Sequence, residues 1–166
     1  MRTSVLLFAI VVGFLTTSVS AQRTIWFDSN WNPTEKENAV YYRPNPKLQQ
    51  DGYLIVDYYK NGIKQKEGFG LSKVLNKEGF EGLVTYYFYN GTTAKEIEFE
   101  EGIKEGKYSE YYKTGELSKR GSYENNLKAG IWKVFYKNGK IKERGKYEKG
   151  EKIGIWKTFY KNVYKK

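Results

Sequence analysis

Apolar and polar residues alternate along most of the chain after its first 50 residues, as they do in half-buried β-strands. Residues 130–137 (GIWKVFYK) show this alternation, and a second alternating segment spans residues 140–147. The dipeptide Asn138-Gly139 lies between the two segments. Asn-Gly favours a two-residue type I′ hairpin turn, in which both central residues need a positive φ. Asn61-Gly62 and Asn90-Gly91 occupy equivalent places, so the pattern predicts several β-hairpins.

The predicted hairpins recur with a period of 24 residues. Each unit begins with one of the glycines Gly82, Gly106, Gly130 and Gly154, and two residues later come Val84, Tyr108, Trp132 and Trp156. Six residues after each glycine come Phe88, Tyr112, Tyr136 and Tyr160. An earlier copy surrounds Asn61-Gly62, and we place the five extra residues that separate it from the next copy within residues 70–81. A fixed period of this length is typical of proteins whose units stack only on their neighbours.

The two-residue turn also predicts the register of the hairpin formed by residues 130–147. The predicted pairs are Trp132 with Gly145, Val134 with Glu143, and Tyr136 with Ile141. The tryptophan ring should cover the backbone that the opposite glycine leaves bare, and Tyr108 should cover Gly121 in the same way. One face of the hairpin is then apolar, and the other face is mixed and basic.

These hairpins predict an all-β fold, an elongated single-layer antiparallel sheet with about five copies of the unit and a truncated last copy. We assign residues 52–166 to the repeats and residues 22–51 to a lead-in that caps one end of the array. An early strand near residues 39–42 is followed by Pro44 and Pro46, which interrupt strand pairing. A single hairpin buries too little surface to be stable, so we expect neighbouring copies to share a ladder of aromatic rings.

Residues 1–21 have the pattern of a secretory signal peptide. Arg2 precedes the apolar run of residues 5–15 (VLLFAIVVGFL), and Val19-Ser20-Ala21 places small residues before a cleavage site after Ala21. The apolar run is shorter than the roughly 20 residues that a spanning helix needs, although an uncleaved membrane anchor remains the alternative. We therefore expect the chain to be exported, to the periplasm or out of the cell.

The chain contains no cysteine and no histidine. Thiol nucleophiles, imidazole bases and soft-metal sites are therefore excluded, and we expect neither a cofactor nor a metal. Glu96 and Glu98 point the same way on a predicted strand and could suit acid–base chemistry. They occur in one copy only, and a charged strand face also explains them, so we expect no enzymatic activity.

Charge is distributed unevenly along the chain. Residues 22–101 contain 10 basic and 12 acidic side chains, whereas residues 102–166 contain 18 basic and 7 acidic side chains. The predicted register places Lys133, Lys142, Arg144 and Lys146 together on the mixed face. This face could bind an anionic lipid or an envelope polymer, and a solvated strand face whose lysines protect sheet edges is the alternative. Export separates the chain from most nucleic acid, which argues against a nucleic-acid partner.

The unit G-x-[WY]-x-x-[FY]-[FY]-x-x-G, followed by G-x-Y, resembles the MORN repeat in the variant found in YwqK-family antitoxins of bacterial toxin–antitoxin systems. Residues 106–115 and 130–139 carry the resemblance, together with the G-x-Y segments 121–123 and 145–147. The resemblance covers about residues 53–164 and implies a curved, single-layer sheet without enzyme activity. Ile97 and Val84 depart from the pattern in one copy, which should pack differently.

A regular array without a chemically distinct insertion offers a long surface, and such surfaces suit protein partners. We therefore expect an exported, non-catalytic structural or protein-interaction module whose partner is an unknown protein. Binding of an anionic lipid or envelope polymer is one alternative, and the family name suggests an antitoxin-like neutralising partner as another.

Overall fold

The computed structural model describes residues 24–160, which form one antiparallel sheet of 12 strands and a short 3₁₀ helix. The elements are β1 (Ile25–Phe27), η1 (Lys36–Asn38), β2 (Tyr41–Arg43), β3 (Lys47–Gln49), β4 (Gly52–Tyr59), β5 (Lys64–Gly70), β6 (Phe80–Tyr87), β7 (Thr93–Glu100), β8 (Ile103–Tyr111), β9 (Leu117–Glu124), β10 (Leu127–Phe135), β11 (Ile141–Glu148) and β12 (Glu151–Thr158). The predicted all-β sheet of consecutive hairpins is confirmed. The predicted signal peptide lies outside the described residues.

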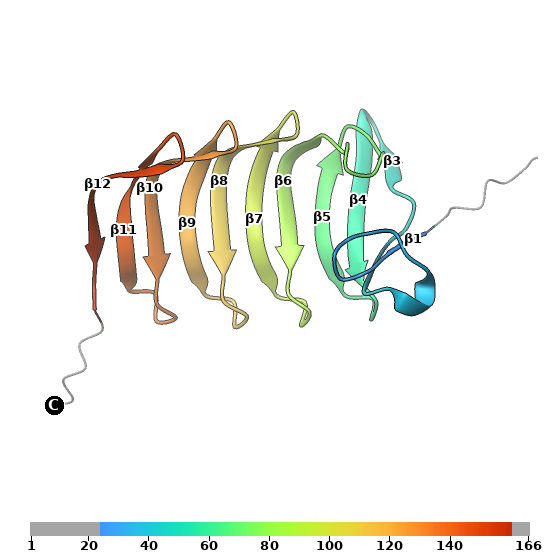
Figure 1. Ribbon diagram of the computed structural model, residues 1–166, viewed down its shortest axis with the longest axis horizontal. Helices are drawn as coiled ribbons and strands as arrows, with labels where there is room; N and C mark the ends of the chain where they lie inside the picture. The colour runs from blue at the N-terminus through green and yellow to red at the C-terminus, as the bar shows by residue number, and fades with distance from the viewer. Residues whose placement is uncertain (1–23, 161–166) are drawn as a thin grey trace, which may run out of the picture.

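The strands lie side by side almost in chain order, from β1 and β2 through β4 to β12, with β3 paired to β4. Figure 1 shows the resulting row of hairpins, with the N-terminal segment at one end and β12 at the other. Each hairpin therefore packs mainly on its sequence neighbours, as in other repeat proteins. Within residues 24–160, no helix has the length and apolar character needed to cross a membrane.

The Asn-Gly dipeptides form a different turn from the predicted one. Between β10 and β11, the N–H of Gly139 donates to the C=O of Tyr136 at 2.9 Å, and the N–H of Tyr136 donates to the C=O of Lys140 at 2.8 Å. Gly139 has a φ of +77°, whereas Asn138 has none of the positive φ that a type I′ turn requires. The loop is therefore a three-residue connection with a glycine bulge, and Gly62, Gly91 and Gly115 close equivalent loops.

Two-residue type I′ turns lie instead at the other end of the strands, between successive hairpins. They consist of Glu101-Gly102, Asn125-Asn126 and Lys149-Gly150, in which both residues have positive φ values between +49° and +87°. Sequence alone marks these segments only as links, because two of the three turns use a charged residue where asparagine or aspartate is more usual. The hairpin loops and the links after β7, β9 and β11 thus turn tightly, which keeps these strands in register, whereas residues 71–79 form a longer link between β5 and β6.

The predicted register of the β10–β11 hairpin is correct except beside the turn. Trp132 lies opposite Gly145 and Val134 lies opposite Glu143, as predicted. Ile141 pairs with Phe135 and not with Tyr136, because the register shifts between Val134 and Phe135. The loop has one residue more than a type I′ turn, which shifts the pairing next to the turn by one residue. The unpaired bulge residue Lys142 in β11 shifts the pairing back by one residue, so the predicted register holds from the Val134–Glu143 pair onward.

The aromatic rings of the C-terminal hairpins lie on one face of the sheet, which we call the ring face. The Tyr147 ring centroid lies 5.7 Å from that of Trp132 and 5.0 Å from that of Trp156. The two tryptophans therefore share a face, as predicted. The other face, which we call the open face, exposes 57% of Ile131, whereas the adjacent Trp132 is only 2% exposed.

Each tryptophan covers a glycine of the preceding hairpin and not the glycine opposite it in its own hairpin. A Cβ atom on Gly121 would lie 2.2 Å from a ring carbon of Trp132, and Gly145 has the same relation to Trp156. The predicted covering of Gly145 by Trp132, and of Gly121 by Tyr108, is therefore wrong.

A bulge at the repeat glycine causes this difference. Residues 130–132 of β10 lie opposite a single residue of β9, Gly121, and Gly130 adopts a φ of +65° that permits the bend. Gly82, Gly106 and Gly154 also have positive φ, and the register shifts beside each of them. The recurring glycine thus marks a bulge, and in the last two copies this bulge directs the tryptophan ring toward the previous hairpin.

The repeat tyrosines connect one hairpin to the next. The hydroxyl of Tyr112 donates to the C=O of Phe135 at 2.7 Å, and the hydroxyl of Tyr136 donates to the C=O of Phe159 at 2.8 Å. Tyr59 makes the same bond to Tyr87 at 2.8 Å. Side-chain donors of this kind satisfy backbone carbonyls near the strand ends, where the ladder stops.

The copy that contains Val84 and Ile97 packs an aliphatic pair in place of a ring and a glycine. The two residues lie opposite each other in β6 and β7 and are 0% and 4% exposed. Val84 also covers Gly68 of the preceding strand, in the way that Trp132 covers Gly121. This copy therefore differs in its side chains, as expected from the sequence, but Val84 covers the glycine of the preceding strand in the same arrangement as Trp132.

Candidate functional site

Four basic residues form a continuous row on the open face of the C-terminal strands. Arg120, Lys133, Arg144 and Lys157 are successive cross-strand partners in β9, β10, β11 and β12. Directly paired residues project from the same face of a sheet, so the four side chains lie side by side. We call these four residues the basic row.

Three of the four cations predicted to share a face lie together. Lys133, Arg144 and Lys146 line a shallow depression of about 440 Å³ on the open face, together with Lys157 of the basic row. Lys142 is the extra residue of the β11 bulge and lies outside the row, with its ammonium 5.9 Å from the centroid of the Tyr136 ring. Sequence reasoning missed the two outer cations of the row, although the 24-residue period would have placed them beside the central pair.

No carboxylate forms a salt bridge with the basic row in residues 24–160. On the ring face, by contrast, the ammonium of Lys119 lies 2.8 Å from the Glu110 carboxylate, and that of Lys152 lies 3.2 Å from Glu143. Like charges on adjacent strands repel one another and create a positive potential that attracts anions. The open face is therefore suited to an acidic partner at this end of the sheet.

The same line of cross-strand partners becomes acidic toward the N-terminal end. Arg120 pairs with Ser109, Ser109 with Glu96, and Glu96 with Thr85. Thr85 in turn pairs with Glu67. The open face therefore changes sign across the sheet, from carboxylates on β5 and β7 to cations on β9 to β12.

The two glutamates considered for catalysis are held by their neighbours on this face. Glu96 accepts a hydrogen bond from the hydroxyl of Tyr111 at 2.7 Å, and Glu98 accepts one from the backbone N–H of Lys107 at 2.6 Å. The hydrogen bond also makes the Glu96 carboxylate the first cause of a raised Tyr111 pKa. Both carboxylates are therefore engaged in hydrogen bonds with residues of the neighbouring strand, as expected for a charged strand face.

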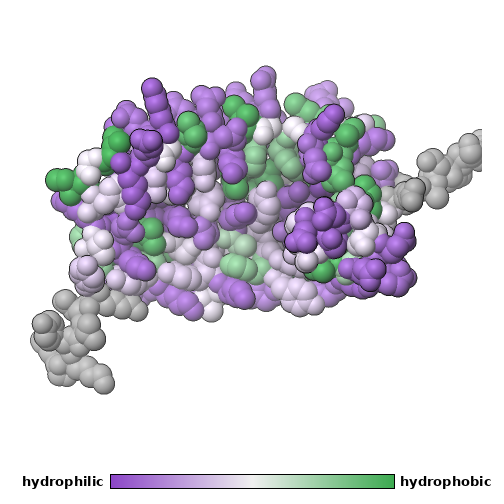
Figure 2. Space-filling model, in the orientation of Figure 1, coloured by the Kyte–Doolittle hydropathy of each residue, from purple (hydrophilic) through white to green (hydrophobic). Residues whose placement is uncertain are grey.

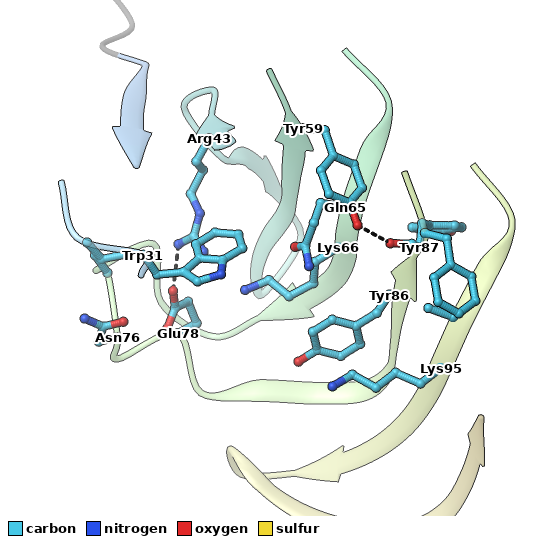
Figure 3. Close-up of a pocket in the computed structure, with 13 residues that line it drawn as sticks. Trp31, Arg43, Tyr59, Gln65, Lys66, Asn76, Glu78, Tyr86, Tyr87 and Lys95 are labelled. Atoms are coloured by element: carbon cyan, nitrogen blue, oxygen red, sulfur yellow. Dashed lines mark hydrogen bonds and ion pairs between the residues drawn. The ribbon is translucent and has the colours of Figure 1, made fainter. Parts of the chain in front are cut away.

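A pocket of about 510 Å³ lies at the opposite end of the sheet (Figure 3). Its walls come from the lead-in segment, from residues 71–79 between β5 and β6, and from strands β4 to β7. Residues 71–79 contain the insertion, in the place predicted for the five extra residues. In the space-filling view, hydrophilic residues cover the lower part of this end of the molecule, and hydrophobic patches lie above them and along the rest of the visible face (Figure 2).

A buried ion cluster supports the wall of the pocket. Arg43, which is 2% exposed, donates to Asp57 at 2.6 Å and 3.0 Å and to Glu78 at 2.6 Å. The ammonium of Lys66 lies 2.9 Å from the second Asp57 oxygen. Burial alone would lower the pKa of Arg43, but the hydrogen bonds and charges of Asp57 and Glu78 raise it. The cluster joins β2, β4, β5 and the insertion into one unit.

Sequence reasoning missed this cluster because two of its members, Arg43 and Glu78, lie in segments that do not repeat. Arg43 belongs to the lead-in, Asp57 to the first hairpin and Glu78 to the insertion. One signal was present, since Asp57 lies two residues after the core residue Ile55 and therefore points toward the ring face. A carboxylate at a core position requires a cationic partner.

Comparison with known families gives two matches within the regular hairpins. The model described as MORN repeat variant matches residues 104–125 and 128–149, which span β8–β9 and β10–β11. No curated protein matches the chain. Together with the sheet of consecutive antiparallel hairpins, these matches support a MORN-repeat protein.

Proposed function

We propose that the chain is an exported, non-catalytic interaction module that binds an acidic protein partner through the open face of its C-terminal hairpins. The basic row is the observation that carries this proposal. Its four cations lie beside Ile131 and Ile155, which are 57% and 82% exposed. Exposed apolar residues next to arginine and lysine are the chemistry of a protein interface, and MORN repeats are structural or interaction modules.

A charge-reversal experiment tests the proposal. The double variant Lys133→Glu/Arg144→Glu removes the centre of the row, and Lys137→Glu/Lys149→Glu makes the same change of net charge at exposed turn residues. After cross-linking in envelope extracts, we expect the wild type and the turn variant to retain the same protein and the row variant to lose it. Retention should weaken as salt increases, because exposed charges are screened. Equal retention by both variants would contradict the proposal.

Binding to an anionic lipid or envelope polymer is the second candidate, because the row contains only cations. Flotation with vesicles that contain an anionic phospholipid, compared with vesicles of neutral lipid only, measures this binding. Salt-dependent flotation that the row variant loses and the turn variant keeps would favour the lipid. Flotation that does not change with salt would exclude an electrostatic contact.

Export and an antitoxin-like role have separate tests. Cleavage after Ala21 predicts that the protein recovered from the cell envelope begins at Gln22, which N-terminal mass spectrometry measures. Recovery of the uncleaved chain would favour the membrane anchor. If the captured protein is a toxin whose activity the chain suppresses, the proposed interaction module acts as its neutralising partner.

A further inference from the structure

The pocket beside the buried ion cluster has one cation without an ion-pair partner. The two carboxylates of the cluster, Asp57 and Glu78, are both engaged by Arg43 and Lys66. Lys95 of β7 also lines the pocket, and its ammonium lies 4.3 Å from the ring centroid of Tyr86 without a salt bridge among residues 24–160. These five ionisable groups, of which Asp57 lies behind the wall of the pocket and the other four line it, carry a net charge of +1.

The carboxylate that lies across the strand pair from Lys95 is already engaged. Glu110 lies opposite Lys95 across β7 and β8, but its carboxylate accepts hydrogen bonds from Lys119 at 2.8 Å and from the hydroxyl of Tyr108 at 2.7 Å. Burial, followed by the neighbouring charge of Lys104, lowers the pKa of Lys95. A half-buried ammonium in this position gains stability from an anion that enters the pocket.

The pocket also contains a buried acceptor without a donor. The side-chain Oε1 of Gln65 is buried and has no hydrogen-bond partner among residues 24–160. Figure 3 shows Gln65 between Tyr59 and Lys66, with the amide directed into the pocket. A buried acceptor is costly unless a donor reaches it, and a ligand hydroxyl would supply one. The ring of Tyr86 adds an apolar surface to the wall, whereas the Trp31 ring is stacked on Tyr41 and has the Lys66 ammonium 5.5 Å from its centroid.

We infer that this pocket binds a small hydroxylated carboxylate of the sugar-acid class. The carboxylate is placed beside Lys95, a hydroxyl donates to Gln65, and the C–H surface of the sugar ring packs against the Tyr86 ring. The single surplus charge favours a monoanion over a phosphate, and it disfavours a ligand with its own ammonium. A volume of about 510 Å³ is that of a site for a small ligand.

Calorimetric titration of the mature chain with glucuronate tests the inference, with glucose and acetate as the neutral and the minimal-anion probes. We expect glucuronate to bind at least about tenfold more tightly than either, because neither probe satisfies both polar groups. Lys95→Met should weaken glucuronate binding about tenfold or more, and Gln65→Leu should weaken it about fivefold. Lys107→Met makes the same change of charge at a side chain that is 86% exposed, and should leave binding unchanged.

Three results would overturn the inference. These are glucuronate binding no tighter than glucose, acetate binding as tight as glucuronate, and Lys95→Met binding equal to wild type. Unchanged circular dichroism of each variant shows that a loss of binding does not come from unfolding. The Lys133→Glu/Arg144→Glu variant should keep glucuronate binding, so failure of the pocket and failure of the basic row are distinguishable. Comparing the monomer with an oligouronate shows whether a free acid or a polymer end is bound.

Discussion

The two ends of the sheet bury the same face by different means. Toward the C-terminus, Trp132 covers Gly121 and Trp156 covers Gly145, and each contact joins adjacent strands. Toward the N-terminus a cluster of buried ions lies on the same face, and Arg43 is bonded to Glu78, which is 35 residues away. The repeat therefore needs only its neighbours, whereas the N-terminal end depends on segments that are distant in the chain.

This difference indicates how an open array can be closed at one end. A regular unit leaves its last ring partly uncovered, and Trp156 on the edge strand β12 is less buried than Trp132. The lead-in and the insertion cover the first hairpins with a charged cluster, which excludes a further hairpin of the same kind. Terminal repeats of solenoid proteins commonly carry such a capping role. Stability should therefore be lost in different ways at the two ends.

The largest expected effect is at the ion cluster. Asp57→Asn leaves Arg43 and Lys66 buried without their shared carboxylate, and loss of one partner of a buried pair costs about 3–5 kcal/mol. Urea unfolding followed by tryptophan fluorescence measures the loss. Glu67→Gln, which removes the carboxylate of the exposed pair with Lys64, is the control and should cost about 1 kcal/mol or less. Equal losses would mean that the cluster does not stabilise the cap.

At the C-terminal end, Gly121→Ala should cost about 1–3 kcal/mol, since the new methyl group would overlap the Trp132 ring. Gly145→Ala introduces the same overlap with Trp156, at 2.2 Å from the nearest ring carbon. Because Trp156 lies on the edge strand, its ring can move away more easily, and the loss should be smaller. Thermal unfolding of the two variants measures the difference. A larger loss at Gly145 would contradict the comparison between interior and edge hairpins.

The features predicted correctly from the sequence are those that depend on local pattern. The period, the strand alternation and the shared face of Trp132 and Trp156 all follow from the spacing of residues along the sequence. The glycine that each tryptophan covers was not predictable, because it depends on a bulge between neighbouring hairpins. In this bulge, residues 130–132 of β10 lie opposite the single residue Gly121 of β9. A second bulge, inside the β10–β11 hairpin, moves Lys142 out of the basic row. The ion cluster was missed for a further reason, since Arg43 and Glu78 come from segments that do not repeat.

A smaller effect concerns Glu110, which links Tyr108 and Lys119 on the ring face. Burial alone would raise its pKa, but the hydrogen bonds from Lys119 and Tyr108 lower it below the ordinary 4.5. Its contribution should be present at pH 7 and lost as the pH falls below this ordinary value, because protonation removes the charge. Glu110→Gln should cost about 1 kcal/mol at pH 7, since the side chain is partly exposed and screened.

Urea unfolding of the wild type and Glu110→Gln between pH 7 and pH 3 measures this contribution. The difference in unfolding free energy should shrink steadily with acid. A difference that stays constant down to pH 3 would show that packing, and not the charge of Glu110, is responsible. Glu116→Gln, at an exposed hairpin turn, is the matched variant and should have a smaller effect at every pH.

The smallest expected effect is a gain, and it lies on the open face. Lys133 pairs with Arg120 on one side and Arg144 on the other, and like charges directly opposite destabilise a sheet. Lys133→Glu converts both pairs into attractive ones and should raise the unfolding free energy by about 0.5 kcal/mol. Lys107→Glu should give no such gain, because Lys107 lies opposite Ser122 and already faces Glu98 at 3.7 Å.

A variant that folds more stably but no longer binds its partner would show that the basic row is retained for binding, since it weakens the sheet that presents it. Urea unfolding midpoints of the wild type and Lys133→Glu at low and high salt measure the electrostatic part of the stability gain, because this gain should shrink as salt screens the charges. If Lys133→Glu destabilises the protein instead, the row contributes to folding, and its cations give no independent support for an acidic partner.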